Sequence, residues 1–370
     1  MIEPCNNKEH PRTAEDMMMA AGPIEFAMMP HIVKVTQAAA IAAAYQMGRG
    51  DKMYADHVAV EAMRRVLNTL DITGTVRIGE GERDEAPMLF IGEIVGTGKS
   101  DIEVDIAVDP LEGTNLTADG APGSIAVIAM SEKGGLLNAP DIYINKIVVG
   151  PEVVKYERAH PDEQIDLNAP VAHNLEIIAK ALNRNINEIV VVILDRPRHK
   201  EMIEQIRRTG ARARLVTDGD LMPGIATAIR GSGVHVVMGS GGSGEAVLTA
   251  AAIKILGGKI LGRLVLPAVA NNKSKEECDE EWRENKSRLK SMGITKANIN
   301  DVMDTKKLAP GCDVVFAASG ITPGFFLNEV KLFGSGDARV NSIVMGSSGV
   351  VQFKDTIYIK NMEETPLRIA

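Results

Sequence analysis

Residues 104–115, VDIAVDPLEGTN, join an apolar run to two carboxylates and a hydroxyl. The apolar run predicts a strand that ends at Asp109, and the Asp-Pro pair with Gly113 predicts a turn after it. A carboxylate at the carboxyl end of a strand points into the crevice where open α/β sheets bind ligands. Asp109 and Glu112 are therefore candidates for chemistry, although taken alone they are equally consistent with an ordinary turn.

A second acidic turn, RIGEGERDEAP, also follows a predicted strand and gathers carboxylates at Glu80, Glu82, Asp84 and Glu85. We expect this strand to neighbour the one ending at Asp109, so that two strand ends present acids to one point. Several hard carboxylates together with water suit Mg²⁺ or Mn²⁺. The backbone N–H groups that follow Glu112 at a glycine turn are suited to a phosphate.

The bulk composition limits the classes of function. The chain has 370 residues, 45% hydrophobic and 24% charged, which predicts a soluble globular protein of two domains with α/β layers. A formal net charge of −8 argues against a nucleic-acid partner. We expect no membrane span and no signal peptide, and the spacing of Cys5, Cys278 and Cys312 suggests neither a disulfide framework nor a zinc site, which together indicate the cytoplasm.

Periodicity divides the chain into two parts. Two helices are expected within residues 31–50 and 54–70, followed by strands and then, from about residue 170, by alternating helices and strands typical of a parallel sheet. A charged helix around Trp282 and three further strands complete the chain. We predict a flexible extension over 1–24, a metal- and phosphate-binding domain over 25–160 and a sugar-phosphate-binding α/β domain over 161–370.

Two glycine motifs favour other functions only weakly. GSGGSG (residues 239–244) matches the dinucleotide fingerprint between a strand and a helix, but no acid follows at the required distance, and Glu245 in the first helical turn would repel a pyrophosphate. GTGKS (residues 96–100) resembles the end of a phosphate loop, but Glu93 stands where its first glycine should be and a strand follows. We interpret GTGKS as a hairpin turn.

The sequence DPLEGT after an apolar strand, with the upstream GEGE turn, resembles the metal-dependent, lithium-sensitive sugar and inositol phosphatase superfamily. Within it, the chain is most similar to the class II fructose-1,6-bisphosphatases, and the segments DKMYADHVAVEAMR, SEKGGLLNAPD, DRPRH, DGD and GITPG agree in order over most of residues 30–350. The resemblance implies a layered αβαβα sandwich with the active site in a cleft between two domains, and a homo-oligomer, dimeric or tetrameric.

The resemblance also implies roles for individual residues. Metal ligands fall on Asp56, Glu80, Asp109, Glu112 and Glu245, and catalytic roles on Thr114, Glu80 and Asp56. Substrate contacts fall on Gly113, Thr114, Tyr143, Arg196, Arg198, Asp218 and Asp220. Without the resemblance, Asp56 is equally an exposed helix acid, Arg198 a surface charge and the Asp218–Asp220 segment a turn.

The implied reaction is hydrolysis of the 1-phosphate of fructose 1,6-bisphosphate with Mn²⁺ or Mg²⁺, in which the cations neutralise the phosphate and activate a water. Three alternatives stay open: activity on sedoheptulose 1,7-bisphosphate as well, suggested by DRPRH; an NAD(P)-binding oxidoreductase built on GSGGSG; and a non-catalytic metabolite-binding relative. Two departures from the family are SGEA at 243–246, which lacks a proline and predicts a looser loop around Glu245, and Met53-Tyr54 before Asp56.

Overall fold

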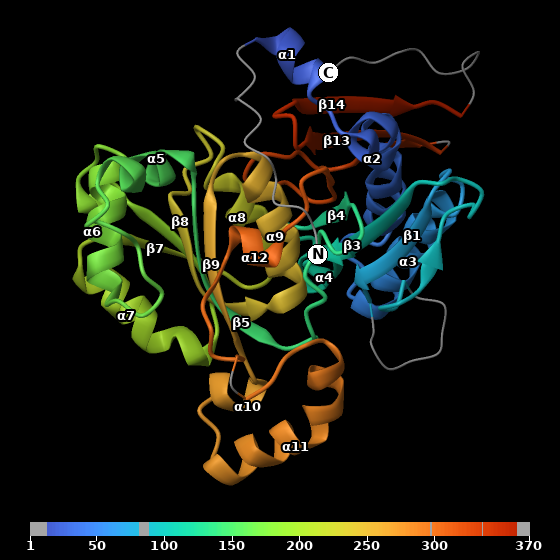
Figure 1. Cartoon of the computed structure of the whole chain (residues 1–370). Helices are drawn as coiled ribbons and strands as arrows, with labels where there is room; N and C mark the ends of the chain where they lie inside the picture. The colour runs from blue at the N-terminus through green and yellow to red at the C-terminus, as the bar shows by residue number, and fades with distance from the viewer. Residues whose placement is uncertain (1–12, 81–88, 297, 335, 361–370) are drawn as a thin grey trace.

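The computed structural model describes residues 13–80, 89–296, 298–334 and 336–360. Their strands form two β-sheets, one of eight strands in the order β12-β13-β11-β4-β3-β1-β2, with β14 paired to β13, and one of six strands in the order β10-β9-β5-β8-β6-β7. Helices surround and separate these sheets (Figure 1). The chain is therefore a mixed α/β protein, as the composition predicted.

The first sheet combines strands from both ends of the chain. Its strands are β1 (Thr73–Ile78), β2 (Ile94–Val95), β3 (Glu103–Glu112), β4 (Ile125–Ser131), β11 (Val314–Gly320), β12 (Lys331–Gly334), β13 (Asp337–Gly346) and β14 (Val351–Tyr358). β1 and β3 are parallel neighbours, which confirms the expected pairing of the two strands that carry acidic turns. The other pairs in this sheet are antiparallel.

The second sheet contains the predicted alternation of helices and strands. Its strands are β5 (Tyr143–Val149), β6 (Val190–Leu194), β7 (Arg212–Val216), β8 (Val236–Gly242), β9 (Lys259–Val265) and β10 (Met303–Asp304). β7, β6 and β8 are parallel, as the alternating pattern predicted, whereas β5 lies antiparallel between β8 and β9. The first sheet is built from two separate parts of the chain, since β11 to β14 return to it after the second sheet has begun. The domain boundary predicted at residue 160 stays a prediction.

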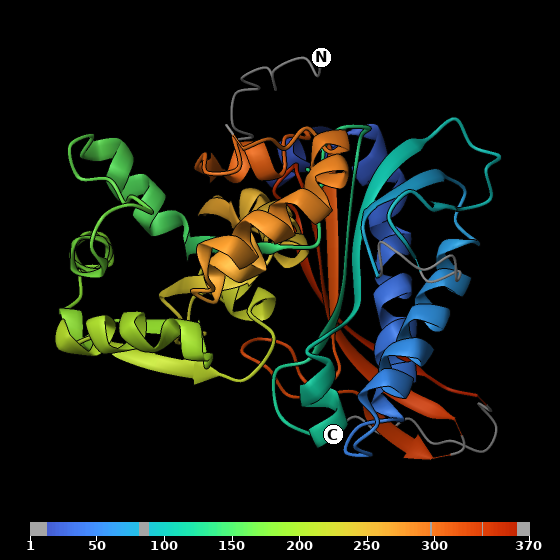
Figure 2. The ribbon, with the colours of Figure 1, turned by 90° about the horizontal axis from the view of Figure 1, so that it is seen from below.

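Three hydrophobic cores hold the helices to the sheets. α2 (Pro23–Ala44) and α3 (Lys52–Leu67) pack on one face of the first sheet. The opposite face packs with the second sheet around α8 (Leu221–Ala226) and α9 (Ser243–Ile255). In Figure 2 the blue helices lie on one side of the first sheet and the yellow and orange helices on the other.

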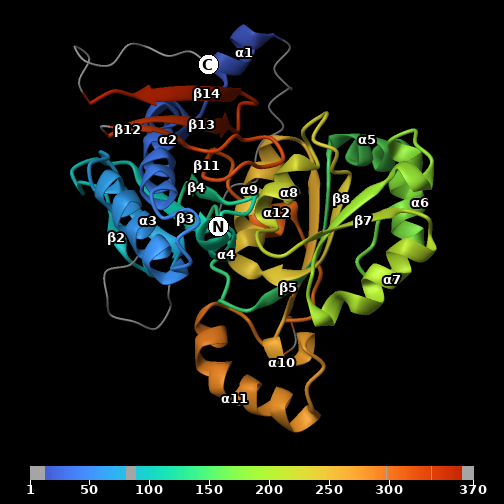
Figure 3. The same ribbon diagram turned by 180° about the vertical axis from the view of Figure 1, so that it is seen from behind.

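The outer face of the second sheet is covered by α5 (Pro151–Ala159), α6 (Val171–Ala181) and α7 (Lys200–Arg208), as Figure 3 shows. The remaining helices are short, except for α11, which is the charged helix predicted around Trp282. They are α1 (Ala14–Met19), α4 (Thr114–Asp119), α10 (Pro267–Ala270), α11 (Lys275–Ser291) and α12 (Thr305–Leu308), with 3₁₀ turns η1 (Ile186–Glu188) and η2 (Pro197–His199). α1 lies within the predicted extension.

Two turn predictions are wrong. GTGKS is not a hairpin turn, because β2 and β3 do not pair with each other but lie on opposite sides of β1. The segment 239–244 is not a loop, because Gly239 to Gly242 continue β8 and Ser243 begins α9 directly. Since no loop separates strand from helix, the cradle that a dinucleotide requires is missing from this segment.

Two expectations about the bulk sequence also need correction. By length and composition α2 would pass for a membrane-spanning helix, but half of its apolar window is buried inside the fold, as in a core helix. Cys312 is disulfide-bonded, whereas Cys278 carries a free thiol. The wide cysteine spacing therefore did not exclude a disulfide.

Candidate metal and phosphate site

A β-bulge in β3 brings Asp109 and Glu112 to the same face of the sheet. Residues three apart in a regular strand point to opposite faces. Here the pairing with β4 shifts from Asp109 opposite Val127 to Glu112 opposite Ile125, so β3 carries one extra residue. Both of these β4 residues face the core between the two sheets, and the two carboxylates therefore point there too.

Pro110 explains why the bulge lies here. Proline has no N–H to give to the ladder, so it is tolerated within a sheet chiefly at edges and bulges. The N–H of Leu111 donates to Oδ1 of Asp109 at 3.1 Å, a local turn that fixes the Asp109 side chain. The prediction that the strand ends at Asp109 is wrong, because the strand resumes after the bulge and ends at Glu112.

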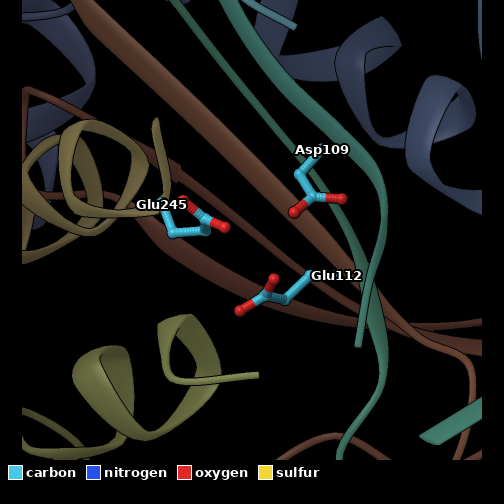
Figure 4. Close-up of side chains that lie close together, drawn as sticks. All are labelled: Asp109, Glu112 and Glu245. Atoms are coloured by element: carbon cyan, nitrogen blue, oxygen red, sulfur yellow. The ribbon is translucent and has the colours of Figure 1, made fainter. Parts of the chain in front are cut away.

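Glu245, on α9, completes a cluster of three carboxylates. One ligand oxygen from each of Asp109, Glu112 and Glu245 lies within 4.8 Å of the others. Figure 4 shows the three side chains pointing toward one another, two from β3 and one from the helix across the gap. The structure thus brings together three of the five acids that the resemblance implied as metal ligands.

Glu80 and Asp56 lie near this cluster. Glu80 follows the end of β1, and Ile78 pairs with Ala107, so Glu80 comes level with Asp109 on the parallel neighbour. Glu80, Asp109 and Glu245 line one cavity. Asp56 projects from α3, and its negative charge contributes to raising the pKa of Glu80.

Burial and mutual repulsion raise the pKa of every carboxylate in this group. Burial is the largest cause and takes the pKa of Glu80 and of Glu112 to about 8, with repulsion from Asp56 and Glu245, respectively, the next largest cause. The pKa of Asp109 and that of Glu245 are raised in the same direction, again mainly by burial. No arginine or lysine forms an ion pair with Asp109, Glu112 or Glu245 among the residues that the structure describes.

The glycines before Glu245 make room for the site. A Cβ on Gly242 would collide with the Glu245 carboxylate, and a Cβ on Gly241 would collide with the carboxylate of Asp220. Glycine at these positions is therefore explained by close approach of acidic side chains rather than by a nucleotide.

Thr114 is the first residue of α4 and follows Glu112 by two positions in the chain. Gly113 precedes it with φ +85°, a left-handed conformation that glycine adopts without strain. Thr114 is half-buried, and its hydroxyl has no hydrogen bond to another described residue. A hydroxyl next to Glu112 is thus left open to solvent or a ligand.

Arg198 is held between two strands of the second sheet. Its Nη2 donates to the carbonyl of Ser240 at 2.8 Å, and its guanidinium carbon lies 4.4 Å from the centre of the Tyr143 ring. Its Nε is buried and has no partner among the described residues. His199 fixes this arrangement, because its Nε2 accepts from the Ser240 N–H at 2.8 Å and its Nδ1 lies 2.7 Å from the Leu194 carbonyl; burial lowers its pKa.

Asp218 connects the two sheets. Its Oδ2 accepts from the side-chain amide of Asn115 at 3.0 Å, and its Oδ1 lies 3.8 Å from Nη2 of Arg196. Asn115 belongs to α4, on the first-sheet side, whereas Arg196 precedes η2. Asp218 and Arg196 thus already have protein partners.

Asp220 is buried and forms an ion pair with Lys146, with Nζ and Oδ1 2.6 Å apart. The next residue, Leu221, donates its backbone N–H to Oε1 of Glu112 at 3.2 Å. The Asp220 segment therefore contacts the carboxylate cluster directly.

The sequence analysis missed Asp141 and Lys146. Asp141 lines the same cavity as Glu80, and its charge contributes to the raised pKa of both Glu80 and Glu245. A lysine within the apolar strand YINKIVV was a signal for a buried ion pair that the sequence analysis did not use. Glu82, Asp84 and Glu85 lie outside the described residues.

Comparisons with known proteins agree with the resemblance. The family described as bacterial fructose-1,6-bisphosphatase, glpX-encoded, matches residues 26–358. A protein of Synechococcus elongatus named D-fructose 1,6-bisphosphatase class 2/sedoheptulose 1,7-bisphosphatase is 46% identical over 342 residues, covering 89% of this chain and 95% of its own. Proteins with the same name from Trichodesmium erythraeum (46% identical over 341 residues) and Synechocystis (45% over 342) have the same coverage, 89% of this chain and 95% of their own.

Proposed function

The chain belongs to the family of bacterial fructose-1,6-bisphosphatases of class 2, and on this basis we propose that it hydrolyses the 1-phosphate of fructose 1,6-bisphosphate to give fructose 6-phosphate and phosphate. The observation that carries the proposal is the convergence of Asp109, Glu112 and Glu245 on one point. The family places the chain among phosphoric monoester hydrolases.

The carboxylate cluster fits a divalent cation. Its donors are hard carboxylate oxygens, they converge within 4.8 Å, and no arginine or lysine pairs with them among the described residues. We propose that Asp109, Glu112 and Glu245 hold Mg²⁺ or Mn²⁺, with Glu80 and Asp56 as the remaining ligands. When bound, the cation supplies Lewis-acid charge that neutralises the phosphate and makes water more acidic.

The chain's own groups account for positioning. We propose that the Thr114 hydroxyl orients the attacking water or the 1-phosphate, since it lies next to Glu112 and has no described protein partner. The backbone N–H groups of Gly113 and Thr114 are proposed to bind phosphate oxygens. Because phosphoryl transfer depends mostly on positioning and electrostatics, these contacts act on rate as well as on binding.

The far phosphate is proposed to bind at Arg198. Tyr143 stacks on its guanidinium, and the Ser240 carbonyl fixes its orientation, so the planar donor group is preorganised. The unpartnered Nε adds a donor that a phosphate oxygen satisfies. Arg196 and Asp218, which lie 3.8 Å apart, are proposed to contact the sugar or its phosphate at the edge of this pocket.

Activity on sedoheptulose 1,7-bisphosphate is a second candidate. The relatives from Synechococcus, Trichodesmium and Synechocystis carry both activities in their names. We infer that the chain accepts both substrates.

We infer that the helices and sheets form the layered αβαβα sandwich of sugar phosphatases, with the site in a cleft between two domains. The three hydrophobic cores, which alternate with the two sheets, support this arrangement. A cytoplasmic homo-oligomer remains part of the proposal.

Phosphate release from fructose 1,6-bisphosphate, measured with Mn²⁺, with Mg²⁺ and with chelator, tests the function. We expect release with either cation and none with chelator. Turnover in a rigorously metal-free preparation contradicts the metal site, and binding of the sugar without release favours a non-catalytic relative. Sedoheptulose 1,7-bisphosphate under the same conditions tests the second activity.

A further inference from the structure

Lys146 is a buried cation in the core between the two sheets. Alternation along β5 places it on the same face as Ile144 and Val148, both part of that core. Lys146 is only 2% exposed. Its ammonium pairs with Asp220 at 2.6 Å, and a buried charge of this kind persists only when it is paired.

This ammonium lies beside the carboxylate cluster. A Cβ on Gly241 would be 3.1 Å from Nζ of Lys146, and a Cβ on the next residue, Gly242, would collide with the Glu245 carboxylate. The positive charge of Lys146 lowers the pKa of Glu245, against the stronger effects of burial and of the negative charge of Asp220, which raise it. Lys146 and Glu245 are thus near neighbours whose charges attract.

Asp220 decides which carboxylate the ammonium pairs with. It is the salt-bridge partner of Lys146, and the N–H of the following residue, Leu221, donates to Glu112 at 3.2 Å. Without Asp220, the buried ammonium would need another anion. Glu245, whose pKa the ammonium already lowers, is one of the acids that converge with Asp109 and Glu112.

We propose that Asp220 is a positioning residue that holds the Lys146 ammonium away from Glu245, and thereby keeps the carboxylate cluster available to a divalent cation. The inference rests on the proposed metal-dependent function. It adds a role to the substrate contact that the family resemblance implied for Asp220, and that contact stays a prediction. Asp220 then acts on the metal site through Lys146.

The test is a double-mutant cycle read by calorimetric titration with Mn²⁺ alone. Asp220→Asn frees the ammonium to compete for the carboxylates, so we expect Mn²⁺ affinity to fall by about tenfold or more. Lys146→Met with Asp220→Asn removes the competitor, so we expect affinity to return to within about threefold of the parent. Lys146→Met alone should bind Mn²⁺ at least as tightly as the parent, since it only removes positive charge.

The control is Lys259→Met. Lys259, on β9 of the same sheet, pairs with buried Glu157 of α5 at 2.8 Å, and neither residue is among the main causes of the raised pKa of Glu112 or Glu245. We expect it to lower the melting temperature without changing Mn²⁺ affinity. This control distinguishes the general effect of losing a buried ion pair on stability from the specific effect of Asp220 on Mn²⁺ binding.

A double variant that binds Mn²⁺ as weakly as Asp220→Asn would overturn the proposal. So would an Asp220→Asn variant with parental Mn²⁺ affinity and a raised KM for the sugar, which would leave only the substrate contact. If Asp220→Asn does not fold, the Lys146→Met/Asp220→Asn double variant is the test. A large loss of Mn²⁺ affinity in that variant would contradict the proposal, because it has no ammonium to compete for the carboxylates. A parent that binds Mn²⁺ but releases no phosphate refutes the proposed function and leaves the binding cycle to judge Asp220.

Discussion

The two ends of β3 carry carboxylates that differ in what compensates their charge. Asp105, near the start, is 2% exposed and accepts from Nε of Arg77 at 2.9 Å and from the N–H of Gly134 at 2.6 Å. Asp109 and Glu112, at the other end, accept backbone N–H groups and interact with each other, and no described arginine or lysine pairs with them.

This difference separates a structural acid from a ligand site. A buried carboxylate with an arginine and a backbone donor is fully compensated and has nothing left to offer a ligand. A buried carboxylate next to a half-buried one, with no counter-charge, is costly, and the raised pKa values of Glu112 and Asp109 express that cost. An external cation would remove the cost, which is why we propose the uncompensated end of β3 as the metal site.

The strongest way to break this comparison is to neutralise one acid at each end. We expect Glu112→Gln to lower kcat by about 10³-fold, because it removes a charge that acts on the reacting phosphate, and to raise the stability of the metal-free protein. Asp105→Asn should cost about 2 kcal/mol of unfolding free energy and leave kcat within a few-fold. Phosphate-release kinetics and denaturant melts without metal measure both.

If Asp105→Asn abolished activity in protein that remains folded, the two ends of β3 would not differ in function. If Glu112→Gln destabilised the metal-free protein, Glu112 would be structural.

Thr114→Val sharpens the comparison by leaving every carboxylate in place. The substitution keeps the shape of the side chain and removes only the hydroxyl, so we expect kcat to fall by about 10²-fold with Mn²⁺ affinity unchanged. Thr114→Ser, which retains the hydroxyl, is the matched control and should keep most activity. Equal losses in both variants would assign the effect to packing.

Arg198→Ala tests whether the arginine pocket acts on binding rather than on chemistry. Because a remote phosphate contact contributes mainly to binding, we expect KM to rise by about tenfold and kcat to change less. Steady-state kinetics at saturating Mn²⁺ measure the two constants. An unchanged KM with a collapsed kcat would place Arg198 at the reacting phosphate.

Local sequence patterns predicted the elements that depend on local structure. Alternating apolar runs located β6, β7 and β8 with the helices between them, and β1 and β3 were correctly expected to be neighbouring strands. These inferences needed only periodicity and the geometry of parallel strands.

What the sequence could not supply depends on distant contacts. The return of β11 to β14 to the first sheet is a matter of long-range pairing, which no local pattern records. Predicting the bulge at Pro110 would need the register of β3 with β4. Predicting the ion pair of Lys146 would need its contact with Asp220, which is 74 residues away in the chain. The metal ligands themselves were suggested by family resemblance, and their ligand roles stay predictions.

The last prediction concerns the pH dependence of stability in the metal-free protein. Glu80 and Glu112 have pKa values raised from 4.5 to about 8 in the folded chain. Between these values the unfolded chain releases the protons that the folded chain keeps, so unfolding free energy falls as pH rises from about 4.5 to 8. We expect a decrease of a few degrees in Tm across this window without metal.

Mn²⁺ binds the deprotonated carboxylates and should reverse most of that decrease at pH 8, because it supplies the missing counter-charge. Glu112→Gln should flatten the metal-free profile, whereas Asp105→Asn should lower Tm without flattening it. A metal-free profile that rises over the same window would show that the carboxylates are already compensated, and the two ends of β3 would then be alike.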